Sequence, residues 1–317
     1  METMQPLLLV SYGAPERQED VVPFLNNLFA GKTVTAERIA AAVQKYERYA
    51  VKTGHYSPLN AECRKLIAGV RRESVDGWLM PPAHSAVYWG NLFWHPLLVD
   101  TVAEMAQDGV ERAVCFATSA FDSPSGNQRY ADALESARQA VGASRGLRPP
   151  LLEKLPLPFD HPLFIEAQAE QLNKSGEHKP PGTPAIVLFS SHSIPLADAA
   201  RCQYVQQLQS TCRAVIEKSG LSLPWELVYQ SRSGAAEHWL GPDIKDRIRE
   251  LATTGQCQSV IVSPIGFFCE NMETEYDLDI EVGECCAELG LSFFRCKTVG
   301  AMPGISRLIC SVAWSTG

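Results

Sequence analysis

Two stretches of this chain share one pattern: residues 188–195 read LFSSHSIP, and residues 8–15 read LLVSYGAP. In each, an apolar run leads into small polar residues, an aromatic or imidazole side chain, and a proline. An apolar run without alternation is typical of a strand buried on both faces, as in a parallel sheet. The pattern therefore predicts two similar α/β halves, with His192 and Tyr12 in equivalent places beyond a strand.

Short apolar or β-branched runs recur along the rest of the chain and predict further strands. The predicted strands are 7–10, 87–89, 113–117, 151–155, 186–189, 227–229, 259–265 and 293–295. Helical spacing of apolar residues lies between them, at 21–29 and after Pro96 and Pro242, and the latter two patterns end at Gly109 and Gly255. Strands that alternate with helices indicate parallel sheets with helices on both faces.

The length of 317 residues suggests two domains at ~150 residues each. We expect an N-terminal domain over 1–159 and a C-terminal domain over 160–317, with the last helix packing back on the first domain. Ligands bind beyond the carboxyl ends of parallel strands. That rule predicts an interdomain cleft lined by Tyr12, Ser119, His192, Ser231 and the residues from 268 onward.

The composition excludes several classes of protein. Apolar residues make up 45% of the chain and charged residues 20%, which rules out a disordered or low-complexity protein. The net charge of 28 − 36 = −8 argues against nucleic acid and against an anionic membrane surface. No apolar run approaches the ~20 residues that span a bilayer, and no phosphate-binding glycine loop occurs. We expect a cytoplasmic protein without integral membrane contact, whose ten cysteines are buried thiols.

His192 is the first candidate for chemistry. Small serines leave room beside it at the predicted strand end. A neutral imidazole there can accept a proton near pH 7 or bind a metal ion. The alternative is a hydrogen-bonded structural histidine.

Three carboxylates form the second candidate. Glu273, Asp277 and Glu281 are spaced i, i+4, i+8, so a helix stacks them along one ridge, and a widened π-type turn aligns them better. Stacked like charges repel, and a cation or solvent must offset that repulsion. The alternative is a solvated acidic face.

Tyr12 and a segment after it supply further candidates. A phenol beyond a strand end and before Gly13 can reach into a cleft, or it is simply a tyrosine at the rim. Arg48, Tyr49 and residues 54–58 bring cationic and hydroxyl donors together, which suits ligand carboxylates. The alternative there is a surface helix end followed by a turn.

Taken together, these motifs resemble the ferrochelatases, the porphyrin metal chelatases of the type II chelatase fold. The resemblance covers essentially the whole chain, and it rests on residues 8–15, 57–59, 190–195, 230–231, 239–242, 264–267 and 272–279. It implies two similar Rossmann-like domains with parallel sheets and an interdomain porphyrin cleft. It also implies a lyase of haem biosynthesis that inserts Fe²⁺ into a porphyrin with loss of two pyrrole protons. Its partners are then the porphyrin and ferrous iron as substrates, with no required cofactor, and the protein is expected to be a monomer.

The resemblance also assigns roles to individual residues. His192 and Glu273 match the family's catalytic pair, and they join Asp277 and Glu281 as the expected metal contacts. Tyr12 matches a tyrosine of coproporphyrin-type enzymes, which favours coproporphyrin III as the substrate. The remaining porphyrin contacts implied by the resemblance are Arg48, Tyr49, Ser57 and Tyr130.

Two features depart from the family's pattern. Many members carry Asp-His two residues before the glutamate, where this chain has Glu270 and Asn271. The loss of that histidine favours one alternative, a catalytically impaired tetrapyrrole- or haem-binding protein. A cobalt chelatase of the same fold is a second alternative, and Asn271 counts against it because such chelatases tend to present more than one histidine to the metal. Only Cys310 lies close to the C-terminus, so the [2Fe-2S] cluster of some members is not expected.

Overall fold

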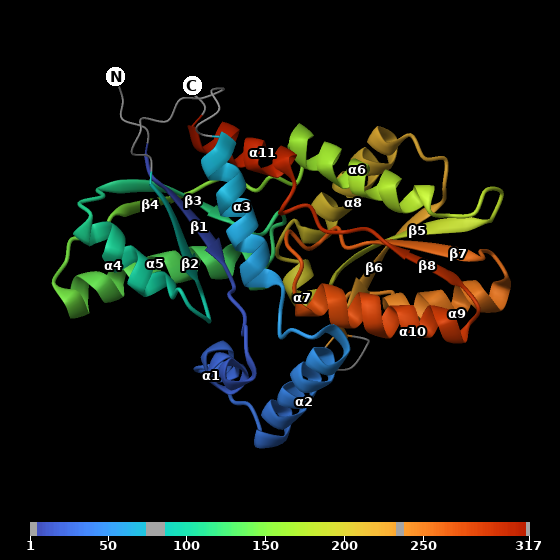
Figure 1. The fold of residues 1–317 in the computed structure, drawn as a ribbon, viewed down its shortest axis with the longest axis horizontal. Coiled ribbons are helices and arrows are strands. Elements are labelled where there is room, and N and C mark those ends of the chain that lie inside the picture. The colour runs from blue at the N-terminus through green and yellow to red at the C-terminus, as the bar shows by residue number, and fades with distance from the viewer. Residues whose placement is uncertain (1–4, 74–85, 233–237, 315–317) are drawn as a thin grey trace. The chain divides into compact units, whose positions relative to one another are not determined.

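The computed structural model describes residues 5–73, 86–232 and 238–314. Within them, eight strands form two parallel sheets of four strands, in the orders β2-β1-β3-β4 and β6-β5-β7-β8 (Figure 1). The strands are β1 (Leu7–Ser11), β2 (Val87–Asn91), β3 (Arg112–Ala117), β4 (Leu151–Lys154), β5 (Ala185–His192), β6 (Trp225–Gln230), β7 (Ser259–Ser263) and β8 (Ser292–Arg295). Each predicted strand is present, and the parallel pairing confirms the predicted α/β class.

Helices connect these strands. They are α1 (Gln18–Phe29), α2 (Ala36–Thr53), α3 (Leu59–Glu73), α4 (Leu98–Gln107), η1 (Pro124–Gln128), α5 (Arg129–Arg145), α6 (Pro162–Glu177), α7 (Leu196–Ala199), α8 (Tyr204–Ser219), α9 (Ile244–Thr254), η3 (Thr274–Val282), α10 (Gly283–Glu288) and α11 (Pro303–Trp314). Of these, η1 and η3 are π-helices. The three predicted helices correspond to α1, α4 and α9. Among the described residues, no helix is both long and apolar enough to cross a membrane.

The chain divides into two compact units, each built around one sheet. The first unit comprises Met1–Thr118, Arg129–Pro156 and Ile309–Gly317, and the second comprises Ser119–Gln128 and Leu157–Leu308. The end of α11 contacts other residues of the first unit: Cys310 Sγ donates to the carbonyl oxygen of Val70 at 3.8 Å, and Trp314 Nε1 donates to that of Gln5 at 2.9 Å.

Both sheets are covered by apolar helix faces, as continuous apolar strands require. In the first unit, Leu8 and Val10 of β1 belong to one buried cluster with α4 and α5. In the second unit, Leu188 of β5 belongs to a cluster with α9, η3 and α10. Figure 1 shows α6 and α8 on the other side of this second sheet, and both helices contact its strands.

The strand order determines where sites form in each unit. The chain leaves the inner strand β1 for β2 on one side and returns to β3 on the other, and β5, β6 and β7 repeat this arrangement. Ligand sites of open parallel sheets lie at such a switch point, beyond the carboxyl ends of the strands. In the first unit this place is occupied by Tyr12 and Thr118, and in the second by His192 and the segment 264–273.

Candidate active site

His192 is the last residue of β5, whereas the sequence predicted a strand that ends at Phe189. The ladder between β5 and β6 continues as far as the pair His192 and Gln230. Seven of the eight residues of β5 are buried, and the half-buried exception is His192. The predicted strand was too short because its pairing with β6, which is distant in sequence, extends it through two serines.

The imidazole of His192 has one nitrogen engaged and the other directed toward Glu273. Nδ1 lies 2.5 Å from the backbone oxygen of Ser193, and because a carbonyl oxygen only accepts, Nδ1 carries the proton. The neutral ring therefore keeps its lone pair on Nε2, which lies 3.8 Å from Glu273 Oε1. The two side chains are 37% and 40% exposed. This arrangement places a proton acceptor beside a carboxylate, with both accessible from solution.

A buried tyrosine fixes the backbone that presents His192. The Tyr204 hydroxyl donates to the carbonyl oxygen of His192 at 3.0 Å and accepts from Ser191 Oγ at 2.5 Å. Burial raises the pKa of Tyr204, so its hydroxyl stays protonated as a donor. Gly266 also passes close to this strand end, since a β-carbon there would lie 2.8 Å from Ser191 Cα. The position of His192 is thus set by tightly packed neighbours.

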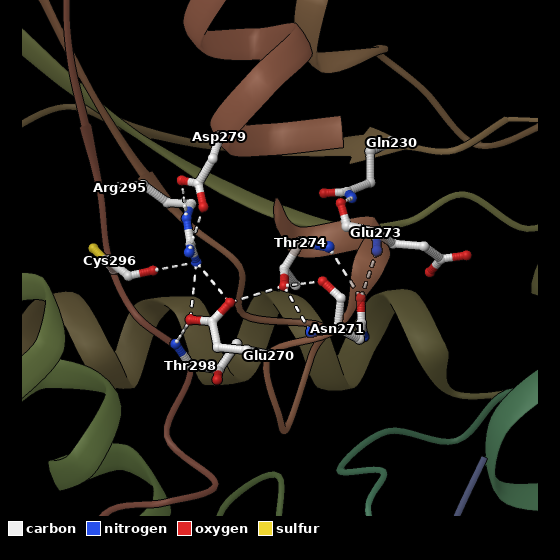
Figure 2. A network of polar contacts seen from close by, with 9 residues as sticks. All are labelled: Gln230, Glu270, Asn271, Glu273, Thr274, Asp279, Arg295, Cys296 and Thr298. Atoms are coloured by element: carbon white, nitrogen blue, oxygen red, sulfur yellow. Dashed lines mark hydrogen bonds and ion pairs between the residues drawn. The ribbon is translucent and has the colours of Figure 1, made fainter. Parts of the chain in front are cut away.

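Glu273 is held through its backbone, and its side chain remains available. Asn271 Oδ1 accepts the backbone N–H of Glu273 at 2.8 Å and that of Thr274 at 3.0 Å. Gln230, the partner of His192 in the ladder, donates through Nε2 to the carbonyl oxygen of Glu273 at 3.3 Å. Figure 2 shows the Glu273 carboxylate pointing away from these contacts. Asn271 therefore acts as a helix cap, which explains an amide at the position that departs from the family's pattern.

A buried ion-pair network supports this turn (Figure 2). Arg295 Nη1 lies 3.0 Å from Glu270 Oε1, and the same guanidinium binds both oxygens of Asp279 on η3. Glu270 also accepts from the backbone N–H of Thr298 at 2.9 Å and from Thr274 Oγ1 at 2.8 Å. Burial raises the pKa of Glu270, but the charge of Arg295 and these hydrogen bonds outweigh it, so the pKa of that carboxyl is lowered. The network anchors both ends of the turn that presents Glu273.

The three predicted carboxylates lie along a π-helix, the geometry that the sequence analysis favoured for aligning them. Glu273 immediately precedes η3, and Asp277 lies within it and is buried. Ser231 Oγ donates to Asp277 from the end of β6. Ser231 has a φ of 59°, a left-handed conformation that is uncommon for a residue with a β-carbon. Such backbone strain clusters at functional sites, and here it directs the Ser231 hydroxyl to the carboxylate row.

Glu281, at the far end of the row, forms an ion pair. Its Oε2 lies 2.7 Å from Nζ of Lys245 on α9. Within the described part of the chain, no group of three or more His, Cys, Asp or Glu side chains is arranged to hold a metal ion. Of the four predicted metal contacts, the structure therefore brings His192 and Glu273 together as a pair and does not gather all four in one cluster.

In the first unit, Tyr12 lies in an aromatic cluster. Its ring centroid is 5.2 Å from that of Phe93 and 5.6 Å from that of Tyr130. The Tyr130 hydroxyl lies 3.2 Å from Thr118 Oγ1, at the end of β3. Gly13 follows Tyr12 with a φ of 73°, and a β-carbon there would approach Asn91 Cβ to 2.8 Å. Glycine is therefore needed for the chain to turn after Tyr12.

The other predicted porphyrin contacts differ in exposure. Arg48 is exposed on α2, but Tyr49 is fully buried, with its hydroxyl 3.1 Å from His55 Nδ1. Ser57 is buried as well, and its Oγ accepts the backbone N–H of Leu59 at 3.3 Å, at the start of α3. Tyr49 and Ser57 thus have structural contacts of their own, and Arg48 presents the exposed charge.

The sequence did not predict the cationic side chains that lie near the aromatic cluster of Tyr12. The guanidinium of Arg129 lies 5.7 Å from the ring centroid of Phe93, next to Tyr130 in the chain. Lys32 Nζ lies 5.9 Å from the ring of Phe29. Burial lowers the pKa of Lys32, and the charges of Arg129 and Arg38 lower it further, so these cations share one region. One sequence feature could have indicated this region: the cation Arg129 is followed directly by the aromatic residue Tyr130.

The chemistry of the second unit follows from this geometry. A proton that reaches Nε2 makes His192 a cation at 3.8 Å from Glu273, and the carboxylate stabilises that cation. The pair can also approach a divalent ion with one nitrogen and one oxygen ligand, a set that suits borderline metals such as ferrous iron. The arrangement fits a reaction in which protons leave and a cation enters at the same place.

Comparison with known proteins agrees with these observations. The family model described as Ferrochelatase matches residues 5–316. A protein of Rhodopirellula baltica named ferrochelatase is 38% identical over 310 residues, covering 96% of this chain and 84% of its own length. A coproporphyrin III ferrochelatase of Nocardia farcinica is 41% identical over 317 residues, covering 96% and 86%.

Solved structures share the fold at low sequence identity. SirB from Bacillus subtilis, in a structure with Fe³⁺, has a TM-score of 0.56 at 10% identity and covers 98% of this chain and 94% of its own. DR2241 from Deinococcus radiodurans, described as similar to chelatases, has a TM-score of 0.55 at 13% identity and covers 98% and 55%. On the family model and the curated relatives together, this chain belongs to the ferrochelatase family.

Proposed function

We propose that this protein inserts Fe²⁺ into coproporphyrin III, with His192 as the acceptor of the pyrrole protons. The observation that carries the proposal is the geometry of His192, whose Nδ1 lies 2.5 Å from a backbone carbonyl oxygen and whose Nε2 lies 3.8 Å from Glu273 Oε1. The relative from Nocardia farcinica is named a coproporphyrin III ferrochelatase, and it supports the choice of substrate.

Metal insertion exchanges one divalent cation for two N–H protons, so the net charge of the macrocycle is unchanged. His192 Nε2 takes the two pyrrole protons one after the other as the Fe²⁺–nitrogen bonds form, and Glu273 stabilises the imidazolium each time. The first proton passes on to the carboxylates and solvent before His192 accepts the second. Asp277 and Glu281 extend the negative charge along η3, and in this proposal they conduct Fe²⁺ in and protons out. No electron is transferred, so the reaction needs no redox cofactor.

The preference for a tetracarboxylate porphyrin rests on charge. Arg129 and Lys32 lie near the aromatic cluster of Tyr12, and Arg48 is exposed on α2. Cations beside aromatic surface suit a flat ring with carboxylates at its edge. Four propionates offer more partners to these cations than the two of protoporphyrin IX.

We also propose that a single chain works in a reducing compartment, the cytoplasm, without an iron–sulfur cluster. His192, Glu273, Asp277 and Glu281 all come from one unit of one chain. Nine of the ten cysteines are buried, and Cys285 and Cys286 pack in the apolar cluster under β5. Buried apolar surroundings raise the pKa of Cys286 to about 12, which disfavours the thiolate that a cluster ligand requires.

The test compares two porphyrins under anaerobic conditions. Purified protein is mixed with Fe²⁺ and either coproporphyrin III or protoporphyrin IX, and kcat/KM is measured from the change in the Soret band. We expect kcat/KM to be higher for coproporphyrin III, and Arg129→Gln to narrow the difference by raising KM for that porphyrin. A higher kcat/KM for protoporphyrin IX contradicts the proposed substrate, and absence of insertion into both contradicts the proposed enzyme.

A further inference from the structure

Lys245 is a cation at the end of the row of carboxylates, and neither the family pattern nor the sequence analysis assigned it a role. Its Nζ lies 2.7 Å from Glu281 Oε2. The two side chains are 35% and 32% exposed, so the pair is only partly open to solvent. Asp243 caps α9 by accepting the backbone N–H of Lys245 at 3.0 Å, which fixes Lys245 in the first turn of that helix.

The charge of Lys245 is maintained by its surroundings. Burial alone lowers the pKa of Lys245, but the hydrogen bond to Glu281 and the charges of Glu281, Asp243 and Asp277 outweigh it, and the pKa is raised. The ion pair at 2.7 Å neutralises Glu281. At the other end of the row, Glu273 forms no ion pair with lysine or arginine among the described residues, and its side chain faces His192 at 3.8 Å.

We propose that Lys245 is a built-in counter-cation that makes Glu281 a weak and transient ligand for incoming Fe²⁺. This inference rests on the proposed function and adds a residue that sets the affinity for the metal. An ion that reaches Glu281 must displace the ammonium group and then tolerate its repulsion nearby. Once the ion moves on toward Glu273, Lys245 returns to Glu281.

The physical consequence is that the row of carboxylates binds Fe²⁺ only weakly at Glu281. A carboxylate without a counter-cation attracts a divalent ion more strongly than one already paired, because attraction scales with the product of the charges. Partly exposed pairs exchange readily, since their net energies are small. Lys245 therefore lowers the affinity for metal at Glu281 and favours transfer inward.

The test measures metal binding separately from turnover. Mn²⁺ binding to the protein without porphyrin is followed by electron paramagnetic resonance for the native chain and for Lys245→Gln, Lys245→Arg and Arg249→Gln. Arg249 is the matched control, because it lies on the same helix α9 and pairs with exposed Asp246 at 2.9 Å. We expect Lys245→Gln to tighten Mn²⁺ binding about fivefold, and the two other variants to stay within about twofold of the native protein.

A second measurement links this affinity to the reaction. In the anaerobic insertion assay, Lys245→Gln should lower the apparent KM for Fe²⁺ by a similar factor and leave that for the porphyrin unchanged. Equal Mn²⁺ affinity of Lys245→Gln and the native chain, or no binding to either, overturns the inference. Tighter binding by Lys245→Arg overturns it as well, because that variant keeps the charge. If the native protein inserts no iron while Lys245→Gln still binds Mn²⁺ more tightly, the proposed function is wrong. The role of Lys245 as a counter-cation is then still supported.

Discussion

Asn271 caps the turn that carries Glu273: its Oδ1 accepts the backbone N–H of Glu273 at 2.8 Å. The same oxygen accepts from Thr274 at 3.0 Å, so one amide satisfies two donors at the start of the helical segment. The amide stands where many family members have a histidine. The sequence pattern predicts the loss of a metal ligand at this position, and the structure shows that Asn271 orients Glu273 of the candidate site.

Asn271→Ala should therefore lower kcat for iron insertion and leave the apparent KM for porphyrin close to the native value. Loss of the cap should also lower the free energy of unfolding by about 1 kcal/mol. Asn271→Asp keeps a capping oxygen and should retain most of the activity. Steady-state kinetics and urea unfolding of the three proteins check this. An Asn271→Ala variant with native kcat would show that the cap does not contribute to iron insertion.

The buried pair of Glu270 and Arg295 makes stability depend on pH. The pKa of Glu270 is lowered in the folded protein, so its contribution is present above the ordinary carboxyl pKa and is lost as pH falls through the lowered value. Glu270→Gln should destabilise the protein by about 3 kcal/mol at pH 7, because it leaves the buried Arg295 with less compensating charge. Its free energy of unfolding should then fall less than that of the native protein between pH 5 and pH 3, a range taken around the ordinary carboxyl pKa.

Denaturant unfolding across that pH range provides the measurement. Glu288→Gln, which removes an exposed carboxylate at the end of α10, serves as the control and should keep the native pH dependence. Parallel curves for Glu270→Gln and the native protein would show that Glu270 does not titrate on unfolding.

Distance from His192 should determine the effect of each carboxylate in the row. Glu273→Gln should reduce kcat most, because its Oε1 lies 3.8 Å from Nε2. Glu281→Gln should instead raise the apparent KM for Fe²⁺, because a distal carboxylate only helps to collect the ion. Metal-dependence curves at saturating porphyrin distinguish the two effects, and an unchanged curve for Glu281→Gln would leave the end of the row without a role.

The strands and the acidic row were predictable because both depend on local sequence. Continuous apolar runs such as residues 7–10 predict buried strands, and the spacing of Glu273, Asp277 and Glu281 allows one ridge. The extension of β5 to His192 was not predictable, because it depends on pairing with Gln230, far along the chain.

The sequence also did not predict the residues that form ion pairs around the candidate site. Arg295 contacts Glu270 across 25 residues, and Lys245 contacts Glu281 across 36. Neither spacing has a helical or strand period, so only tertiary packing brings them together. Ser57 stays a predicted porphyrin contact, and its hydroxyl accepts a backbone N–H at the start of α3.

The central claim is that Nε2 of His192 accepts the pyrrole proton, and the initial rate of iron insertion by His192→Ala tests it most directly. Coproporphyrin III is presented with Fe²⁺ under anaerobic conditions to the native protein and to His192→Ala, and porphyrin binding is measured in parallel by fluorescence. Loss of a general base costs ~10²–10⁴ in rate. We predict a rate lowered at least a hundredfold, with the Kd for porphyrin within a few-fold of the native value. A variant that binds porphyrin and retains more than a tenth of the native rate would contradict the account, because the proton would then leave by another route.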